Sequence, residues 1–152
     1  MNSQVRAATL ADTSGCLELA AEVEDLFGPM PHFDKQVRNS IGRGVVLVVA
    51  CETKVHGAAL LSRDDQPHHI NWLSVRSTSR RTGIASLLME GILNRWPTDA
   101  IEVVTFGSDV AGGLPARRFY ERHGFRSLGP AQPAEDGSPR DRFVRPAEFF
   151  MD

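Results

Sequence analysis

The fold of this chain is decided by residues 73–85, whose sequence is LSVRSTSRRTGIA. The segment begins as an apolar strand, passes through a short polar loop, and enters a helix whose first turn contains Gly83 and Ala85. The first N–H groups of a helix have no partner within it, and the helix dipole is positive there. Small residues let a diphosphate approach these groups closely, and Arg80 and Arg81 add positive charge. The residues therefore predict an anion site, with an ordinary strand-to-helix connection carrying solvated arginines as the alternative.

This segment lacks two common phosphate-binding motifs. No Gly-Lys-Ser or Gly-Lys-Thr follows the loop, and the three-glycine spacing of a dinucleotide-binding fingerprint is absent. After the loop, apolar residues recur at helical spacing from Ile84 to Trp96, and Pro97 ends the helix. The segment is therefore a strand, a loop and a long helix, and the expected anion site depends on neither motif.

Outside this segment the sequence alternates strands and helices. We expect a strand at 4–8, a helix that starts at Thr9 or Asp12 and runs to about Phe27, and a shorter helix that Asp34 caps and that ends at Ile41. Further strands are expected at 45–51, 55–62, 68–75, 100–106, 125–128 and 142–145, with a helix from Pro115 to Gly124 before the last two. This order predicts an α/β (α+β) fold, a single domain over residues 1–152 with a mixed central sheet.

Two segments together resemble a known family. Residues 80–85, RRTGIA, match the [Gln/Arg]-x-x-Gly-x-[Gly/Ala] signature of the GNAT superfamily of N-acetyltransferases. Residues 116–125, ARRFYERHGF, resemble the A-x-x-F-Y-x-x-x-G-F element of that family, in the right order and at a fitting separation. The resemblance implies a GNAT-like fold in which about four helices flank the sheet.

The resemblance also implies that acetyl-CoA is the cosubstrate. In the family, the strand that corresponds to 73–75 splays away from its neighbour, here 103–106, and the pantetheine arm enters the gap. Main-chain groups of Leu73 and Val75 are expected to pair with this arm. The other cofactor-binding residues that the resemblance implies are Arg80, Arg81, Thr82, Gly83, Ile84 and Ala85. The acetyl group then passes directly to an amine, without a covalent enzyme intermediate.

The chain departs from the family pattern in two places. Many members carry an Asn just before the Ala-x-x-Phe-Tyr helix, where this chain has Gly113. Ser108 and Asp109 are the nearby groups that could replace the hydrogen bond of that Asn to the pantetheine. Ser77 stands where a Pro is common.

The resemblance places Tyr120, the only tyrosine of the chain, at the usual general-acid position of the family. Acetyl transfer needs a neutral amine, a stabilised oxyanion and a proton donor for the departing thiolate. We expect the backbone N–H near Val75 to bind the oxyanion. A phenol titrates near ~10 and a thiol near ~8.5, so full proton transfer to the thiolate is uphill by about 2 kcal/mol. Tyr120 can act by hydrogen bonding, or donate fully if Arg117, one helical turn earlier, stabilises its phenolate. The alternative is a residue at the edge of the core.

Two residues are candidates for a base or an acceptor-binding group. His69 shares strand parity with Leu73 and Val75, and a histidine near ~6.5 can take a proton through water. Its alternative is an exposed histidine at the start of a strand. On a helical wheel Glu24 falls between Leu17 and Ala20, at the edge of the apolar face of the first helix, where a lone carboxylate is costly unless it is paired or used. We expect Glu24 to bind a cationic acceptor or relay its proton, with a salt bridge as the alternative, and His32 to line the same pocket with Phe33.

Composition argues against several function classes. The chain has 152 residues, 17 Lys and Arg against 19 Asp and Glu, and a net charge of -2, which does not favour nucleic-acid binding. No apolar run approaches the roughly 18 to 20 residues that span a bilayer, and the first residues lack the apolar region of a signal peptide. Cys16 and Cys51 have no metal-type spacing, and no His, Cys and carboxylate set predicts a metal site. We therefore expect a cytoplasmic protein that uses no metal, membrane or nucleic acid. The resemblance to the GNAT superfamily adds a possible homodimer, which is common for that fold.

Three functions remain open from the sequence. The first is N-acetylation of a primary amine on a small molecule, such as a metabolite or an antibiotic-like compound, by acetyl-CoA. The second is N-acetylation of a peptide or protein, and the third is a non-catalytic acyl-CoA-binding module. The segment from Gly28 to Phe33 resembles a lid more than an open peptide groove, which favours the small molecule.

Overall fold

The computed structural model describes residues 4–24, 30–51, 54–63, 67–80, 82–134 and 136–147. The chain divides into two compact units. The first comprises Met1–Arg63 and Asn71–Arg95, and the second comprises Asp64–Ile70 and Trp96–Asp152. One strand, β4 (His68–Val75), contributes residues to both units.

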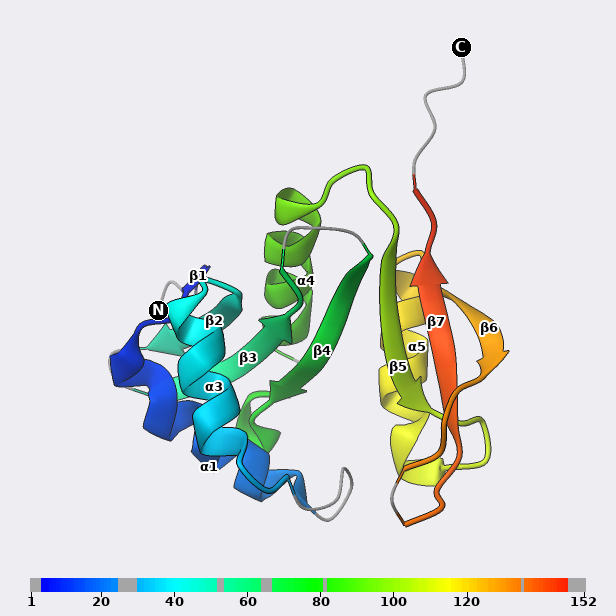
Figure 1. Cartoon of the computed structure of the whole chain (residues 1–152), viewed down its shortest axis with the longest axis horizontal. Helices are drawn as coiled ribbons and strands as arrows, with labels where there is room; N and C mark the ends of the chain where they lie inside the picture. The colour runs from blue at the N-terminus through cyan, green and yellow to red at the C-terminus, as the bar shows by residue number, and fades with distance from the viewer. Residues whose placement is uncertain are drawn as a thin grey trace. The chain divides into compact units, whose positions relative to one another are not determined.

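Where the structure describes it, the first unit contains helices α1, α3 and α4 and the first strands of the sheet (Figure 1). Its elements besides β4 are β1 (Val5–Ala7), the 3-10 turn η1 (Leu10–Asp12), α1 (Thr13–Glu22), α3 (Phe33–Gly42), β2 (Val46–Cys51), β3 (Lys54–Leu61), the 3-10 turn η2 (Ser77–Ser79) and α4 (Ile84–Arg95). β2 pairs antiparallel with both β1 and β3, and the β2–β3 register shifts at a bulge between Val49 and Ala50.

The helices of the first unit cover both faces of these strands. Because side chains alternate along a strand, neighbouring residues of β2 face opposite sides. Val46 and Val48 join the apolar core formed with α1 and α3. Leu47 instead meets α4, where a Cβ on Gly91 would lie 3.1 Å from its side chain. The continuous apolar run at 46–49 is thus explained by burial on both faces.

A glycine on β3 lets the N-terminal turn of α4 pack closely against the sheet. A Cβ on Gly57 would lie 2.7 Å from Ile84 Cγ2 and 3.2 Å from Leu88 Cδ1. Real Cβ atoms do not approach that closely, so a larger residue would push the helix away. Gly57 therefore helps to fix the position of the loop that precedes α4.

The described residues of the second unit form parallel and antiparallel strands and one helix. Its elements are the start of β4, β5 (Ile101–Phe106), the 3-10 turn η3 (Ala111–Gly113), α5 (Leu114–Arg122), β6 (Arg126–Pro130) and β7 (Arg140–Arg145). β4 pairs parallel with β5 through His68–Ile70 and Ile101–Val103, whereas β7 pairs antiparallel with β5 and β6. α5 packs against β5, and Phe143 of β7 is 1% exposed at the centre of this core.

The predicted fold class is confirmed. The hydrogen-bonded strand order is β1-β2-β3-β4-β5-β7-β6, a mixed sheet that is accompanied by four described helices, α1, α3, α4 and α5. Pro115 lies in the first turn of α5, and Gly124 has the positive φ, 89°, of a residue just past a helix end. The assignment of residues 1–152 to a single domain stays a prediction.

Two predicted helix boundaries are wrong. α1 ends at Glu22 because Val23 leaves helical geometry, with φ -104° and ψ 9°, whereas the sequence suggested a helix to about Phe27. Residues 25–29 lie outside the described residues. α3 begins at Phe33 with His32 as its N-cap, in a left-handed conformation with φ 65°, so Asp34 lies in the first turn and does not cap. No described helix is long and apolar enough to cross a membrane.

Candidate active site

The loop that precedes α4 presents main-chain N–H groups at an open surface. Gly83 is exposed with φ 85°, and a Cβ built on it would meet nothing within 4 Å. The N–H of Leu87 donates to Gly83 O at 3.0 Å, so α4 winds from Gly83 onward. In the described part of the chain no main-chain carbonyl outside the helix accepts a hydrogen bond from the N–H groups of 82–85. These groups are therefore available to an anion, and the helix dipole favours one there.

Arg76, which follows β4 directly, braces the start of this loop. Its Nε and one terminal nitrogen donate to Val55 O at 3.1 and 2.9 Å, and its own N–H donates to His56 O at 2.7 Å. The guanidinium also reaches the carboxylates of Glu18 at 3.2 Å and Glu22 at 3.7 Å. The side chain is only 12% exposed. Arg76 thus ties the loop to both β3 and α1.

Glu22 of α1 accepts a hydrogen bond from the N–H of Ser77. This bond, assisted by the charges of Arg76 and Arg80, lowers the pKa of Glu22 below its ordinary value. At about 100° per residue, Glu18 and Glu22 fall on one polar face of α1, and both carboxylates on this face contact the loop. Because Glu22 bonds to the N–H of Ser77 and not to those of residues 82–85, it does not block the predicted anion site.

The middle of the loop is held from inside. Ser79 is buried, and its hydroxyl lies 2.8 Å from Nδ1 of His56 on β3. The hydroxyl of Thr82 donates to Ser79 O. Arg80 is exposed. Arg81, predicted to bind the cofactor, lies outside the described residues. The loop therefore turns its own polar groups inward at Ser79 and leaves the helix start free.

The alternation predicted along β4 is confirmed. His68, Ile70, Trp72 and Ser74 are buried, whereas His69, Asn71, Leu73 and Val75 are half-buried or exposed. Leu73 and Val75 therefore share a side of the strand in the first unit. His69 lies on the same side at a position of β4 that belongs to the second unit, opposite Glu102 in the parallel register.

Tyr120 lies in an aromatic cluster of the second unit. Its ring meets those of Phe119 and Phe125, with both centroids 5.4 Å away, and the side chain is 5% exposed. Burial raises the pKa of Tyr120 above its ordinary value because the phenolate loses its hydration. The phenol is therefore neutral at physiological pH and well suited to donate a hydrogen bond. It is a poorer full proton donor than a solvated tyrosine.

The predicted role of Arg117 is wrong. Its guanidinium donates to Phe106 O at 2.7 Å and to the Asp141 carboxylate at 2.6 Å, and it lies 4.9 Å from the centre of the Phe143 ring. An ion pair and a ring contact fix it against β5 and β7. Helical spacing brought Arg117 and Tyr120 one turn apart, but the acceptors on the neighbouring strands decided where the guanidinium points.

Gly113, at the position where the resemblance suggests an asparagine, packs directly against Phe106. A Cβ at this position would lie 2.2 Å from Cβ and 2.3 Å from Cγ of Phe106. No side chain fits, because α5 begins directly against that ring. Ser108 and Asp109 are both exposed in the loop before η3.

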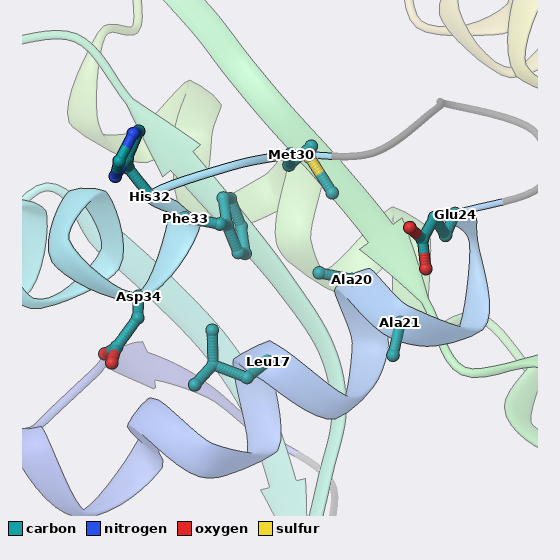
Figure 2. A pocket seen from close by; sticks show the side chains of 8 residues that line it. All are labelled: Leu17, Ala20, Ala21, Glu24, Met30, His32, Phe33 and Asp34. Atoms are coloured by element: carbon teal, nitrogen blue, oxygen red, sulfur yellow. The ribbon is translucent and has the colours of Figure 1, made fainter.

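A pocket of about 320 Å³ opens in the first unit (Figure 2). It is lined by Leu17, Ala20, Ala21, Glu24, Met30, His32, Phe33 and Asp34. In Figure 2 the carboxylates of Glu24 and Asp34 lie at opposite ends of the group, with Phe33 and Ala20 between them. Glu24 lies beyond the end of α1, yet it lines the same pocket as Leu17 and Ala20, as the helical wheel predicted.

The two carboxylates of this pocket differ in their partners. Asp34 forms an ion pair with Arg38 at 2.9 Å, one helical turn along α3. Glu24 is exposed, and no hydrogen bond or ion pair joins it to another described residue. The unbalanced negative charge of the pocket is therefore carried by Glu24.

Sequence reasoning missed Arg76 and the pair of His68 and Asp99. The arginine directly after a strand, with an acidic face on α1, was a usable signal for the first. His68 is 1% exposed, bonds to Asp99 at 2.9 Å and stacks on Trp96 with a centroid distance of 4.3 Å. No spacing rule connects residues 31 positions apart, so only the fold shows this pair. Among the described residues, no group of three or more His, Cys, Asp and Glu is placed to hold a metal.

The sequence of this chain matches one family of known proteins. Residues 21–139 match the family model described as an acetyltransferase (GNAT) domain. No protein with a curated description matches the sequence significantly. The matched range includes residues of both units, the loop before α4 and the Tyr120 segment.

Many solved structures share the fold at low sequence identity. Ard1 from Thermoplasma volcanium is 17% identical, with a TM-score of 0.81 and coverage of 98% of this chain and 100% of that one. The ribosomal-protein-S18-alanine N-acetyltransferase from Escherichia coli is 14% identical, with a TM-score of 0.75 and coverage of 99% and 97%. The PaiA N-acetyltransferase from Thermoplasma acidophilum, in complex with coenzyme A, is 13% identical, with a TM-score of 0.70 and coverage of 93% and 98%.

Proposed function

Because the chain belongs to the GNAT acetyltransferases, we propose that it transfers the acetyl group of acetyl-CoA to a primary amine of a small molecule. Membership of this family means that the chain is an N-acetyltransferase with acetyl-CoA as the acetyl donor. What we propose beyond the family assignment is the class of the acceptor and the residues that act on it. The expected homodimer and cytoplasmic location stay predictions.

The observation that carries this proposal is the pocket lined by Glu24. Its volume of about 320 Å³ lies at the small end of the range of small-molecule sites. Its walls are apolar at Leu17, Met30 and Phe33, and Glu24 supplies a carboxylate without a described partner. A compact organic cation fits this combination, because its ammonium group would balance Glu24 while its carbon skeleton covers the apolar wall.

The proposed cofactor site uses the main chain of the loop. The diphosphate of acetyl-CoA would accept hydrogen bonds from the N–H groups of 82–85, next to the open surface at Gly83. Arg80 adds an exposed positive charge, and Arg81 is proposed for the same role from the sequence. Leu73 and Val75 are proposed to pair with the pantetheine arm through their main-chain groups.

The reaction proposed is a direct transfer. The neutral amine nitrogen attacks the thioester carbonyl carbon, the carbon–sulfur bond breaks, the amine loses a proton and the CoA thiolate gains one. Glu24 would hold the ammonium form and relay its proton, and His69 is the second candidate for this step. Tyr120, kept neutral by burial, would donate a hydrogen bond to the departing sulfur.

Two measurements test the proposal in sequence. Isothermal calorimetry with CoA should show saturable binding, and a thiol-release assay with acetyl-CoA and a panel of primary amines should identify acceptors. Compact cations with an apolar body should give higher kcat/KM than neutral or anionic amines. Turnover that is confined to peptides or to anionic amines would contradict the small-molecule acceptor.

Glu24→Gln should weaken acceptor use without affecting the cofactor. Loss of a charge pair with the ammonium is expected to lower kcat/KM for the best amine about tenfold, while the Kd for CoA stays unchanged. Asp34→Asn is the matched control in the same pocket. Because Arg38 already neutralises Asp34, this change should cost less than about threefold. Equal kcat/KM for Glu24→Gln and the unmodified protein would remove the assigned role of Glu24.

The second candidate is acetylation of a peptide or protein. The fold is similar to that of the S18-alanine N-acetyltransferase, whose name identifies a ribosomal protein as its acceptor. The same thiol-release assay with short peptides that carry free N-termini or lysines distinguishes the two. Peptides should outperform small amines by at least tenfold in kcat/KM if this alternative is correct.

A further inference from the structure

We propose that Glu22 is a positioning residue for the cofactor loop, holding Ser77 and Arg76 so that the start of α4 is ready to bind the diphosphate. The inference rests on the proposed function, because it assigns a role within that cofactor site. Glu22 itself does not touch the cofactor in this proposal. It acts through the main chain of the loop.

The contact pattern of Glu22 supports this role. One carboxylate oxygen accepts the hydrogen bond from the N–H of Ser77, and the other lies 3.7 Å from the Arg76 guanidinium. The Glu22 side chain is 27% exposed, whereas Glu18, the other partner of Arg76, is 66% exposed. Exposed ion pairs contribute little, so the less exposed Glu22, which also bonds to the main chain, is the stronger restraint.

Arg76 gives this restraint a fixed support. Its two hydrogen bonds to Val55 O, at 3.1 and 2.9 Å, hold the guanidinium against β3 whether or not Glu22 is present. Glu22 then links α1 to a guanidinium that is hydrogen-bonded to β3. From Ser77 the chain reaches Gly83 in six residues, with Ser79 bonded to His56 on the way. Ser77 thus lies between two anchored residues, Arg76 and Ser79, and its N–H bond to Glu22 adds a third restraint to the segment that leads to α4.

The same helix also serves the proposed acceptor pocket. At about 100° per residue, Leu17 and Ala21 fall on one face of α1, and Glu18 and Glu22 fall on the adjacent face. The first face lines the pocket, and the second holds the loop. Ordering of the loop by a cofactor should therefore also reduce the motion of α1.

The sign of the effect separates positioning from simple electrostatics. Glu22 carries a negative charge near Arg80, and CoA is a polyanion. If charge alone mattered, removal of Glu22 would strengthen CoA binding, and the gain would shrink in high salt. If Glu22 positions the loop, its removal must weaken CoA binding in spite of the lost repulsion, and the loss must persist in high salt.

The test is the Kd for CoA, measured by calorimetry on the full chain at low salt and at about 0.5 M salt, where charges are screened within ~4 Å. Glu22→Ala should raise the Kd about tenfold at both salt concentrations, because a hydrogen bond to a charged group is lost. Glu22→Gln keeps an oxygen that can accept from Ser77 and should stay within about threefold of the unmodified protein. Glu90→Ala, an exposed carboxylate lost from α4, is the charge-matched control and should bind CoA unchanged or slightly tighter.

A second readout does not depend on affinity. Hydrogen exchange of the α1 amides should slow when CoA saturates the unmodified protein, and this protection should be largely absent in Glu22→Ala at saturating CoA. Unchanged or tighter CoA binding by Glu22→Ala, or equal protection of α1 in both proteins, would overturn the inference. If the unmodified protein does not bind CoA, the proposed function fails and the inference fails with it. If the unmodified protein and Glu22→Ala bind CoA equally well, the role of Glu22 is wrong but the proposed function stands.

Discussion

The loop before α4 and the cluster around Tyr120 obtain their chemistry from different sources. The loop offers main-chain N–H groups whose direction is set by backbone geometry, with Gly83 at φ 85° and Arg76 and Glu22 as supports. Tyr120 offers one hydroxyl whose acidity is set by the rings of Phe119 and Phe125. Main-chain chemistry depends on conformation, and side-chain chemistry depends on solvation. The two regions should therefore respond to different kinds of substitution.

The largest effect is expected from Gly83→Val. A β-branched residue is strained at this positive φ, and its side chain would occupy the open surface at which we propose that the diphosphate binds. We expect the Kd for CoA to rise about 100-fold, which corresponds to roughly 2.7 kcal/mol. Calorimetry with CoA measures this change.

Gly137→Val is the matched control for this substitution. Gly137 has nearly the same φ, 86°, and an equally open Cβ position, but it lies in the second unit, far along the chain from the loop. Both variants should lose about 1–3 kcal/mol of stability from backbone strain. CoA binding that weakens equally in both variants would show that strain, and not the loop, caused the loss.

The next effect concerns packing in the second unit. Gly113→Ala places a Cβ within 2.2 Å of Phe106, so either the ring or the start of α5 must shift. Overpacking of this kind costs about 1–3 kcal/mol, which urea denaturation measures. Gly42→Ala at the end of α3, where a Cβ meets nothing within 4 Å, should show no such loss. Equal stability of the two variants would mean that α5 adjusts freely.

Tyr120→Phe tests the hydroxyl alone. Because the raised pKa makes full proton transfer to the thiolate unfavourable, the hydroxyl contributes one hydrogen bond, and kcat should fall about tenfold with the KM for acetyl-CoA unchanged. The thiol-release assay with the best amine measures both constants. A fall of more than about 1,000-fold would instead indicate full proton donation, and an unchanged kcat would remove the role.

The smallest effect is a slope of stability with pH. The folded-state pKa of Tyr120 is raised, whereas the unfolded chain ionises at about 10. Above that pH the unfolded state releases the proton and the folded state keeps it, so stability should fall as the pH rises from about 9 to 11. Urea midpoints across this range should decline less steeply for Tyr120→Phe. Parallel curves for the two proteins would show that the phenol is solvated in the folded state.

The sequence predicted the parts of the site that depend on local pattern. The strand, loop and helix at 73–85 follow from apolar spacing and one glycine, and the alternation of β4 was correct at His69, Leu73 and Val75. The helical wheel correctly placed Glu24 with Leu17 and Ala20, although α1 ends before Glu24. These features involve residues within two helical turns of each other, so short-range geometry determines them.

The prediction for Arg117 was wrong because its long side chain can reach acceptors that are distant in sequence. Arg117 was assigned to Tyr120 by helical spacing, but Asp141 and Phe106 O hold it. The two helix boundaries are errors of a different kind, set by backbone conformation: α1 ends at Glu22, and His32, not Asp34, is the N-cap of α3. An arginine reaches several acceptors, and their distances are unknown until the strands are paired.

The sequence by itself determined that residues 73–85 form a strand, a loop and the start of a helix within a mixed α/β sheet, because hydrophobic period and glycine position act over a few residues. Only the tertiary structure decided that Glu22 and Arg76 hold the loop, that Gly113 must lack a side chain beside Phe106, and that Tyr120 is desolvated. Each of these depends on atoms brought together from distant parts of the chain, where packing and dielectric environment, and not local pattern, set the energy.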